Sequence, residues 1–130
     1  MSKPVLLCVD DEKLVLDSLV NQLRNHFGSQ FFYETAENSE EAWEVINEMM
    51  GLGYPIKLII SDWLMPIEKG DAFLIAVANK HPEIVLIMLS GHADELSVQR
   101  AQQYANLQVF IRKPWDKEHL VHEINIALKK

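Results

Sequence analysis

Five short runs rich in apolar residues predict five strands. Residues 5–9, 58–60 and 84–89 are continuously apolar, as in strands that a parallel sheet buries on both faces. Residues 31–35 and 107–111 mix apolar with polar side chains, which is typical of strands with one flank toward solvent. We therefore expect three central strands, with the two mixed runs at the edges of the sheet.

Between these runs, apolar residues recur at the spacing of amphipathic helices. The first stripe comprises Leu16, Leu19, Val20, Leu23 and Phe27. A second helix is predicted after Asn38, which with Glu41 resembles an N-terminal capping arrangement, with a stop at Gly51 and Gly53. Strands that alternate with helices in this way predict an α/β fold, a parallel sheet covered by helices on both faces.

Three further helices complete the alternation. One is predicted over about residues 71–80, where Pro82 stops it, and the last begins after Pro114 with Asp116 as its N-cap. Residues 94–105 hold few apolar positions among glutamines, so we expect a lightly anchored helix there and the most mobile one. No repeat or linker interrupts the pattern, and residues 1–130 are interpreted as a single domain.

Composition narrows the possible classes of protein. The length of 130 residues with 48% hydrophobic residues suffices for one buried core. Cys8, the single cysteine, lies in an apolar run and indicates a buried thiol in a reducing compartment, so a cytoplasmic location is expected. No signal peptide or membrane anchor is evident, and no membrane partner is expected. The formal net charge of −7, without a Lys/Arg cluster, argues against direct nucleic-acid binding.

Polar residues follow four of the five predicted strands. Asp10 and Asp11 follow the first, Asp62 the third, Ser90 the fourth and Lys113 the fifth. Ligands of open α/β sheets bind at these carboxyl ends. Three clustered carboxylates repel one another and predict a divalent cation, best met by Mg²⁺. Such a site can place a phosphoryl group against a carboxylate, with the lysine and serine contacting its oxygens.

Four motifs surround these residues, in order along essentially the whole chain. They are Val9-Asp10-Asp11-Glu12, Ser61-Asp62-Trp63-Leu64-Met65-Pro66 with Gly70, Leu89-Ser90-Gly91, and Lys113-Pro114-Trp115. Together they resemble the receiver domains of two-component response regulators. The resemblance implies a flavodoxin-like, doubly wound sheet of five parallel strands in the order 2-1-3-4-5 with five helices. It also implies a phosphoacceptor switch that modifies itself, rather than a turnover enzyme.

The resemblance implies a role for each acidic residue. Asp62 would accept the phosphoryl group from a sensor histidine kinase or a phosphotransfer protein. Asp11 and Asp62 would bind Mg²⁺ directly, Asp10 through water, and the backbone carbonyl of Leu64 would be a further ligand.

Other positions would respond to the phosphoryl group. Ser90 and Lys113 would contact its oxygens, and Ser90 and Phe110 would form the conformational switch. Leu64 and His92 would tune the phosphoryl lifetime, and the Lys113–Pro114 peptide bond would be cis. The output face would run from the fourth to the fifth helix, toward a homodimer, a downstream effector protein or an output domain outside this sequence.

Three alternatives use part of the same residues. Carboxylates after strands are often helix caps, but caps do not explain Ser90 and Lys113. A Mg²⁺-dependent phosphatase or phosphotransferase with an aspartyl nucleophile is the main alternative, yet Leu64 stands where the haloacid dehalogenase type has a second aspartate. A flavodoxin-like electron carrier needs a phosphate-binding loop after the first strand, where Asp10 and Asp11 would repel a flavin phosphate.

Overall fold

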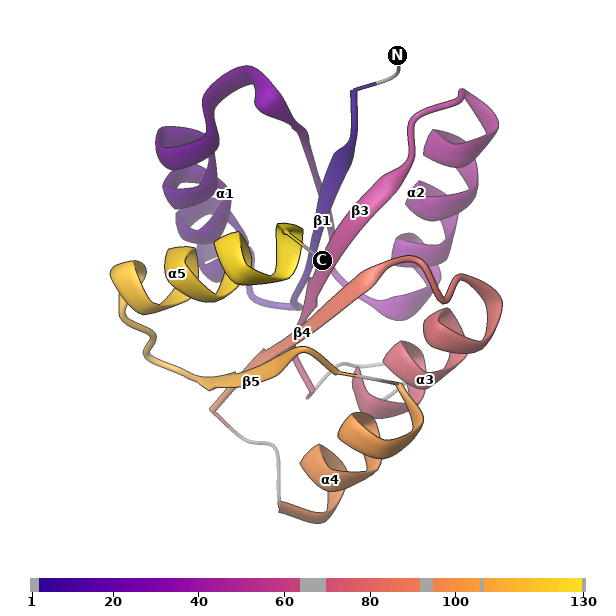
Figure 1. The fold of residues 1–130 in the computed structure, drawn as a ribbon, viewed down its shortest axis with the longest axis vertical. Helices are drawn as coiled ribbons and strands as arrows, with labels where there is room; N and C mark the ends of the chain where they lie inside the picture. The colour runs from indigo at the N-terminus through magenta and orange to yellow at the C-terminus, as the bar shows by residue number, and fades with distance from the viewer. Residues whose placement is uncertain (1–2, 64–69, 92–94, 106, 130) are drawn as a thin grey trace.

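A five-stranded parallel sheet forms the centre of the molecule (Figure 1). The computed structural model describes residues 3–63, 70–91, 95–105 and 107–129. The strands are β1 (Val5–Val9), β2 (Phe32–Ala36), β3 (Ile56–Ser61), β4 (Val85–Ser90) and β5 (Val109–Arg112). Their order is β2-β1-β3-β4-β5, and each neighbouring pair is parallel. The prediction that the two mixed runs form the edges is therefore confirmed.

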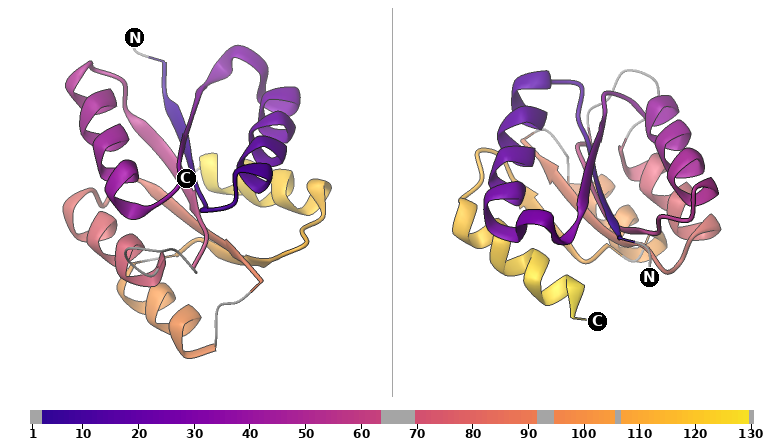
Figure 2. Two further views of the ribbon diagram at one scale, coloured as in Figure 1. Left: turned by 180° about the vertical axis from the view of Figure 1, so that it is seen from behind. Right: turned by 90° about the horizontal axis from the view of Figure 1, so that it is seen from above.

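Helices cover both faces of the sheet. They are α1 (Lys13–Phe27), α2 (Ser39–Gly51), α3 (Gly70–Lys80), α4 (Glu95–Tyr104) and α5 (Lys117–Leu128), with a short 3-10 turn at Gly28–Gln30. α1 and α5 lie on one face, and α2, α3 and α4 lie on the other (Figure 2). The fold is the flavodoxin-like α/β architecture that the resemblance implied.

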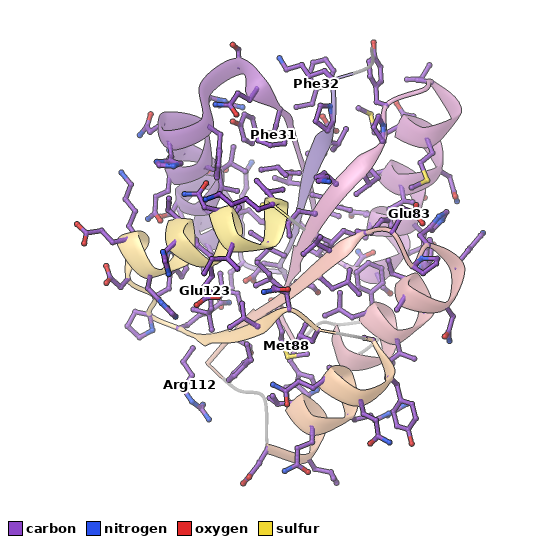
Figure 3. All side chains as sticks on the ribbon, viewed as in Figure 1. Phe31, Phe32, Glu83, Met88, Arg112 and Glu123 are labelled. Carbon is purple, nitrogen blue, oxygen red and sulfur yellow. The ribbon has the colours of Figure 1, made fainter. Side chains whose placement is uncertain are left out.

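Each face has its own hydrophobic core, because successive strand residues point to opposite sides. On β1, Leu6 and Cys8 pack with α1 and α5, whereas Leu7 packs with α2, α3 and α4. Burial raises the pKa of the Cys8 thiol to about 12, consistent with the inert core cysteine that the sequence indicated. Side chains fill the space between the sheet and both helical layers (Figure 3).

Capping side chains set the start of α2. The Asn38 side chain accepts a hydrogen bond from the Glu41 backbone N–H at 2.8 Å, and the Glu41 carboxylate accepts one from the Glu37 N–H at 3.1 Å. This reciprocal arrangement confirms the predicted start of α2. Its predicted end is also confirmed, since α2 ends at Gly51 and the chain turns at Gly53, with φ of 89°. Glycine tolerates that positive φ without a Cβ clash.

α4 is anchored lightly, as its polar sequence indicated. Ala101 is its buried residue, while Leu96 and Tyr104 are exposed. Among the described residues, no helix combines the length and apolar content needed to cross a bilayer.

Candidate functional site

The carboxyl ends of the strands bring the predicted polar residues to one edge of the sheet. Asp10 follows β1, Asp62 follows β3, Ser90 ends β4 and Lys113 follows β5. Asp10, Asp62 and Ser90 are all buried. Arg112, the last residue of β5, marks this end of the sheet in Figure 3, away from Phe32 at the start of β2. Parallel pairing thus gathers side chains that lie about a hundred residues apart in the chain.

Three carboxylates form an acidic cluster at this edge. One oxygen each from Asp10, Asp11 and Asp62 lies within 4.8 Å of the other two. Asp11 is exposed, whereas Asp10 is buried. Asp10 Oδ1 accepts a hydrogen bond from the Glu12 backbone N–H at 2.9 Å. The sequence therefore predicted the members of the cluster correctly.

Lys113 bridges the two buried carboxylates. Its Nζ donates to Asp10 Oδ2 at 2.5 Å and to Asp62 Oδ2 at 3.2 Å, and Glu12 Oε1 lies 4.0 Å away. Burial by itself would lower the pKa of Lys113, but the hydrogen bond to Asp10 and the charges of Asp62 and Asp10 raise it above its ordinary value. Lys113 is therefore a fixed cation at neutral pH.

Burial dominates at Asp10 as well. Desolvation raises the pKa of this carboxyl above its ordinary value, although the hydrogen bonds from Lys113 and the Glu12 N–H lower it. The negative charge of Asp62 raises it further. One ammonium group thus compensates only part of the charge that the fold places here.

The donor set fits a hard divalent cation. Asp62 Oδ1 is buried and has no hydrogen-bond partner among the described residues, a costly state for a carboxylate oxygen. It belongs to the same cluster of carboxylates as Asp10 and Asp11, and carboxylate oxygens are the ligands that Mg²⁺ prefers. Asp10, Asp11 and Asp62 are the residues that could hold the ion.

The remaining predicted residues divide into three groups. Ser90 is fully buried at the end of β4, and its carbonyl accepts a hydrogen bond from the Lys113 N–H at 3.3 Å. Phe110 is half-buried on β5, packs with the α2–α3–α4 core, and lies with its ring centroid 5.3 Å from the Arg112 guanidinium. Leu64 and His92, assigned to metal binding and lifetime tuning, lie outside the described residues. The Lys113–Pro114 peptide bond is cis, as expected.

Two contributions to the site were missed. Glu12 supplies a backbone donor to Asp10 and places its carboxylate near Lys113, and its position directly after Asp11 was the available signal. Trp115 donates a hydrogen bond to Gln22 on α1. No local pattern in the sequence links those two residues.

The fold, with its acidic cluster and lysine at the carboxyl ends of the strands, defines a class of signalling protein. The chain matches the response regulator receiver domain over residues 6–125. It therefore belongs to the receiver domain family of response regulators, the phosphoacceptor switches of two-component signalling. The comparison does not favour the phosphatase or phosphotransferase alternative.

Relatives and solved structures agree with this assignment. The chain is 31% identical to the hydrogenase transcriptional regulatory protein HoxA of Cupriavidus necator over 124 residues, covering 95% of this chain but 24% of HoxA. The receiver domain of an HD domain-containing protein from Pseudomonas fluorescens Pf-5 has the same fold, with a TM-score of 0.86 at 22% identity, covering 99% of this chain and 89% of that one. The beryllofluoride-activated NtrC4 receiver domain dimer gives a TM-score of 0.82 at 26% identity, covering 96% of each chain.

Proposed function

We propose that Asp62 accepts a phosphoryl group from a sensor histidine kinase or a phosphotransfer protein. The observation that carries the proposal is the state of the Asp62 carboxylate. It is buried beside Asp10 and Asp11, Oδ2 is 3.2 Å from Lys113 Nζ, and Oδ1 has no hydrogen-bond partner among the described residues. A carboxylate oxygen of Asp62 is thus available to attack phosphorus, next to a fixed positive charge.

The transfer needs few groups from the protein. An Asp62 oxygen forms a bond to phosphorus while the phosphorus–nitrogen bond of a phosphohistidine breaks, and the imidazole nitrogen keeps the electron pair. Lys113 exchanges part of its contact with Asp10 and Asp62 for the oxygens of the phosphoryl group, and the Ser90 hydroxyl donates a hydrogen bond to the same oxygens. Asp10, Asp11 and Asp62, with the backbone carbonyl of Leu64, would hold the cation. When bound, Mg²⁺ supplies charge neutralisation between the carboxylates and the incoming phosphoryl oxygens.

Signalling then follows from a local change in charge. Ser90 and Phe110 form the switch, and Leu64 and His92 set the phosphoryl lifetime. The output face comprises α4, β5 and α5, where a homodimer, an effector protein or an output domain binds. The NtrC4 receiver domain is a dimer when activated, and the far greater length of HoxA supports an output domain. We assign residues 1–130 to one receiver domain that acts in the cytoplasm.

Intact mass spectrometry tests the acceptor. Incubation with acetyl phosphate and Mg²⁺ should add about 80 Da, the mass of one phosphoryl group on the nucleophile. Asp62→Asn should abolish the addition, since the amide is a poor nucleophile, whereas Asp17→Asn on the exposed side of α1 should not. Labelling of the Asp62→Asn variant at the parent rate would move the acceptor to another residue.

A further inference from the structure

Trp115 ties the segment after β5 to α1. Its indole Nε1–H donates a hydrogen bond to Gln22 Oε1 at 2.8 Å, between positions 93 residues apart. Both residues are half-buried, and the Trp115 side chain packs against the core between the sheet and the α1–α5 layer. The indole N–H is a hydrogen-bond donor only, so its bond to Gln22 fixes the orientation of the ring.

The same short segment carries Lys113. The Lys113 backbone N–H is held by the Ser90 carbonyl at 3.3 Å, and its ammonium by Asp10 and Asp62. Pro114 separates Lys113 from Trp115 and has a fixed φ. Few torsions therefore remain between the lysine backbone and the anchored indole, so movement of the indole would be transmitted to Lys113.

α1 connects both sides of the site. It begins at Lys13, directly after the segment with Asp10 and Asp11, and it presents Gln22 to Trp115 about two and a half turns further along. A rigid helix thus sets the separation between the acidic segment and the segment with Lys113.

We infer that Trp115 is a positioning residue, which holds Lys113 in place for the phosphoryl group through its hydrogen bond to Gln22. The inference rests on the proposed role of Lys113 in phosphoryl binding. Catalytic groups need to be held closely to their working geometry, and displacement by a remote change can cost up to about a hundredfold in rate. Lys113 keeps its ion pairs without the indole bond, so the expected loss is smaller.

Phosphorylation kinetics of four variants test the inference. Gln22→Leu removes the acceptor, and Trp115→Phe removes the donor while keeping an aromatic ring. Each should lower the maximal rate with acetyl phosphate about threefold to tenfold, with the half-saturating Mg²⁺ concentration unchanged. Gln22→Glu retains an acceptor oxygen and should restore the parent rate. The double variant Gln22→Leu, Trp115→Phe should be no slower than the slower of the two single variants, because both substitutions remove the same hydrogen bond.

Ser18→Ala is the matched control. Gln22 also donates from Nε2 to Ser18 Oγ at 3.4 Å on the exposed side of α1, so this change removes a Gln22 contact but leaves Trp115 alone. It should phosphorylate at the parent rate. Thermal unfolding of every variant establishes that the rates compare folded proteins.

The outcomes separate this inference from the proposed function. Parent rates in Gln22→Leu and Trp115→Phe, or equal losses in Gln22→Glu and Gln22→Leu, would overturn the positioning role while leaving Asp62 as the acceptor. A parent protein that takes no phosphoryl group on Asp62 would overturn both.

Discussion

At the scale of single residues, the negative charge of the site is only partly compensated. Asp10 is 3% exposed and Asp62 is 3% exposed, and taking a carboxylate out of water costs several kcal/mol. Lys113 offsets part of that cost through two charge-assisted hydrogen bonds. The pKa of Asp10 nevertheless remains raised by burial. The two buried carboxylates therefore destabilise the metal-free site in spite of their contacts with Lys113. This favours the binding of a cation or a movement of the Lys113 side chain.

Asp10→Asn should stabilise the metal-free protein at pH 7.5, by roughly 1 kcal/mol. Because the folded-state pKa of Asp10 lies above its ordinary value of 3.8, the parent is penalised where the carboxyl is ionised. That penalty disappears below pH 3.8 and grows as the pH rises through the folded-state pKa. The advantage of the variant should therefore shrink toward acidic pH. Urea unfolding in EDTA at several pH values measures it.

Asp17→Asn on the exposed surface of α1 is the control for a general effect of charge, and it should change the free energy of unfolding little. An Asp10→Asn protein that is less stable than the parent at pH 7.5 would show that the bond from Lys113 outweighs desolvation.

At the scale of elements, the helices differ in how firmly they are held. α5 buries Leu120, Val121, Ile124 and Ala127, whereas the buried residue of α4 is Ala101, and Leu96 is 76% exposed. A helix with little buried apolar surface opens at low free energy. α4 directly precedes β5 in the chain, and Phe110 of β5 packs against the same hydrophobic core as Ala101 of α4. These properties suit an element whose position changes with the state of the site.

Hydrogen exchange should be faster in α4 than in α2 or α5 in the unmodified protein, because its amides open more readily. Beryllofluoride with Mg²⁺ should alter exchange over residues 95–105 and 109–112, because in the proposed function it biases the switch at Ser90 and Phe110. The Asp62→Asn variant, treated in the same way, should show no change. Differences confined to residues 10–12 and 61–63 would argue against α4 as the output element.

At the scale of the whole molecule, one parallel sheet concentrates the charge at one edge. The chain carries a formal net charge of −7, and three of its carboxylates meet beside the carboxyl ends of β1 and β3. A ligand that binds the folded chain and not the unfolded one stabilises the entire domain through this edge. A metal ion bound at this edge would therefore increase the stability of the whole domain.

Mg²⁺ should raise the melting temperature. At ten times its dissociation constant, the ion adds about 1.4 kcal/mol of stability, which corresponds to a shift of about 5 °C for a domain of this size. Asp11→Ala should abolish the shift without unfolding the protein, since Asp11 is exposed. Differential scanning fluorimetry with Mg²⁺ and then with EDTA measures it.

Asp17→Ala provides the matched loss of an exposed aspartate outside the cluster, and should keep the full shift. An undiminished Mg²⁺ effect in Asp11→Ala would place the ion elsewhere in the protein.

Local pattern by itself determined most of the fold. The mixed composition of residues 31–35 and 107–111 predicted the edge positions of β2 and β5, because solvent on one flank tolerates polar side chains. Asn38 and Glu41 predicted the start of α2 through a capping arrangement confined to four residues. The strand-end positions of Asp10, Asp62 and Lys113 also sufficed to bring them together, since parallel strands share a carboxyl edge.

Only the tertiary structure decided how those residues interact. Asp10 is buried while its neighbour Asp11 is exposed, and the position of Lys113 decides which Asp62 oxygen is paired and which is left without a partner. The bond between Trp115 and Gln22 joins a loop to a helix across 93 residues. Hydrophobic periodicity specifies which face of an element is buried, but not which side chains of distant elements meet there. Those contacts depend on how the helices pack on the sheet, and packing is a property of the assembled fold.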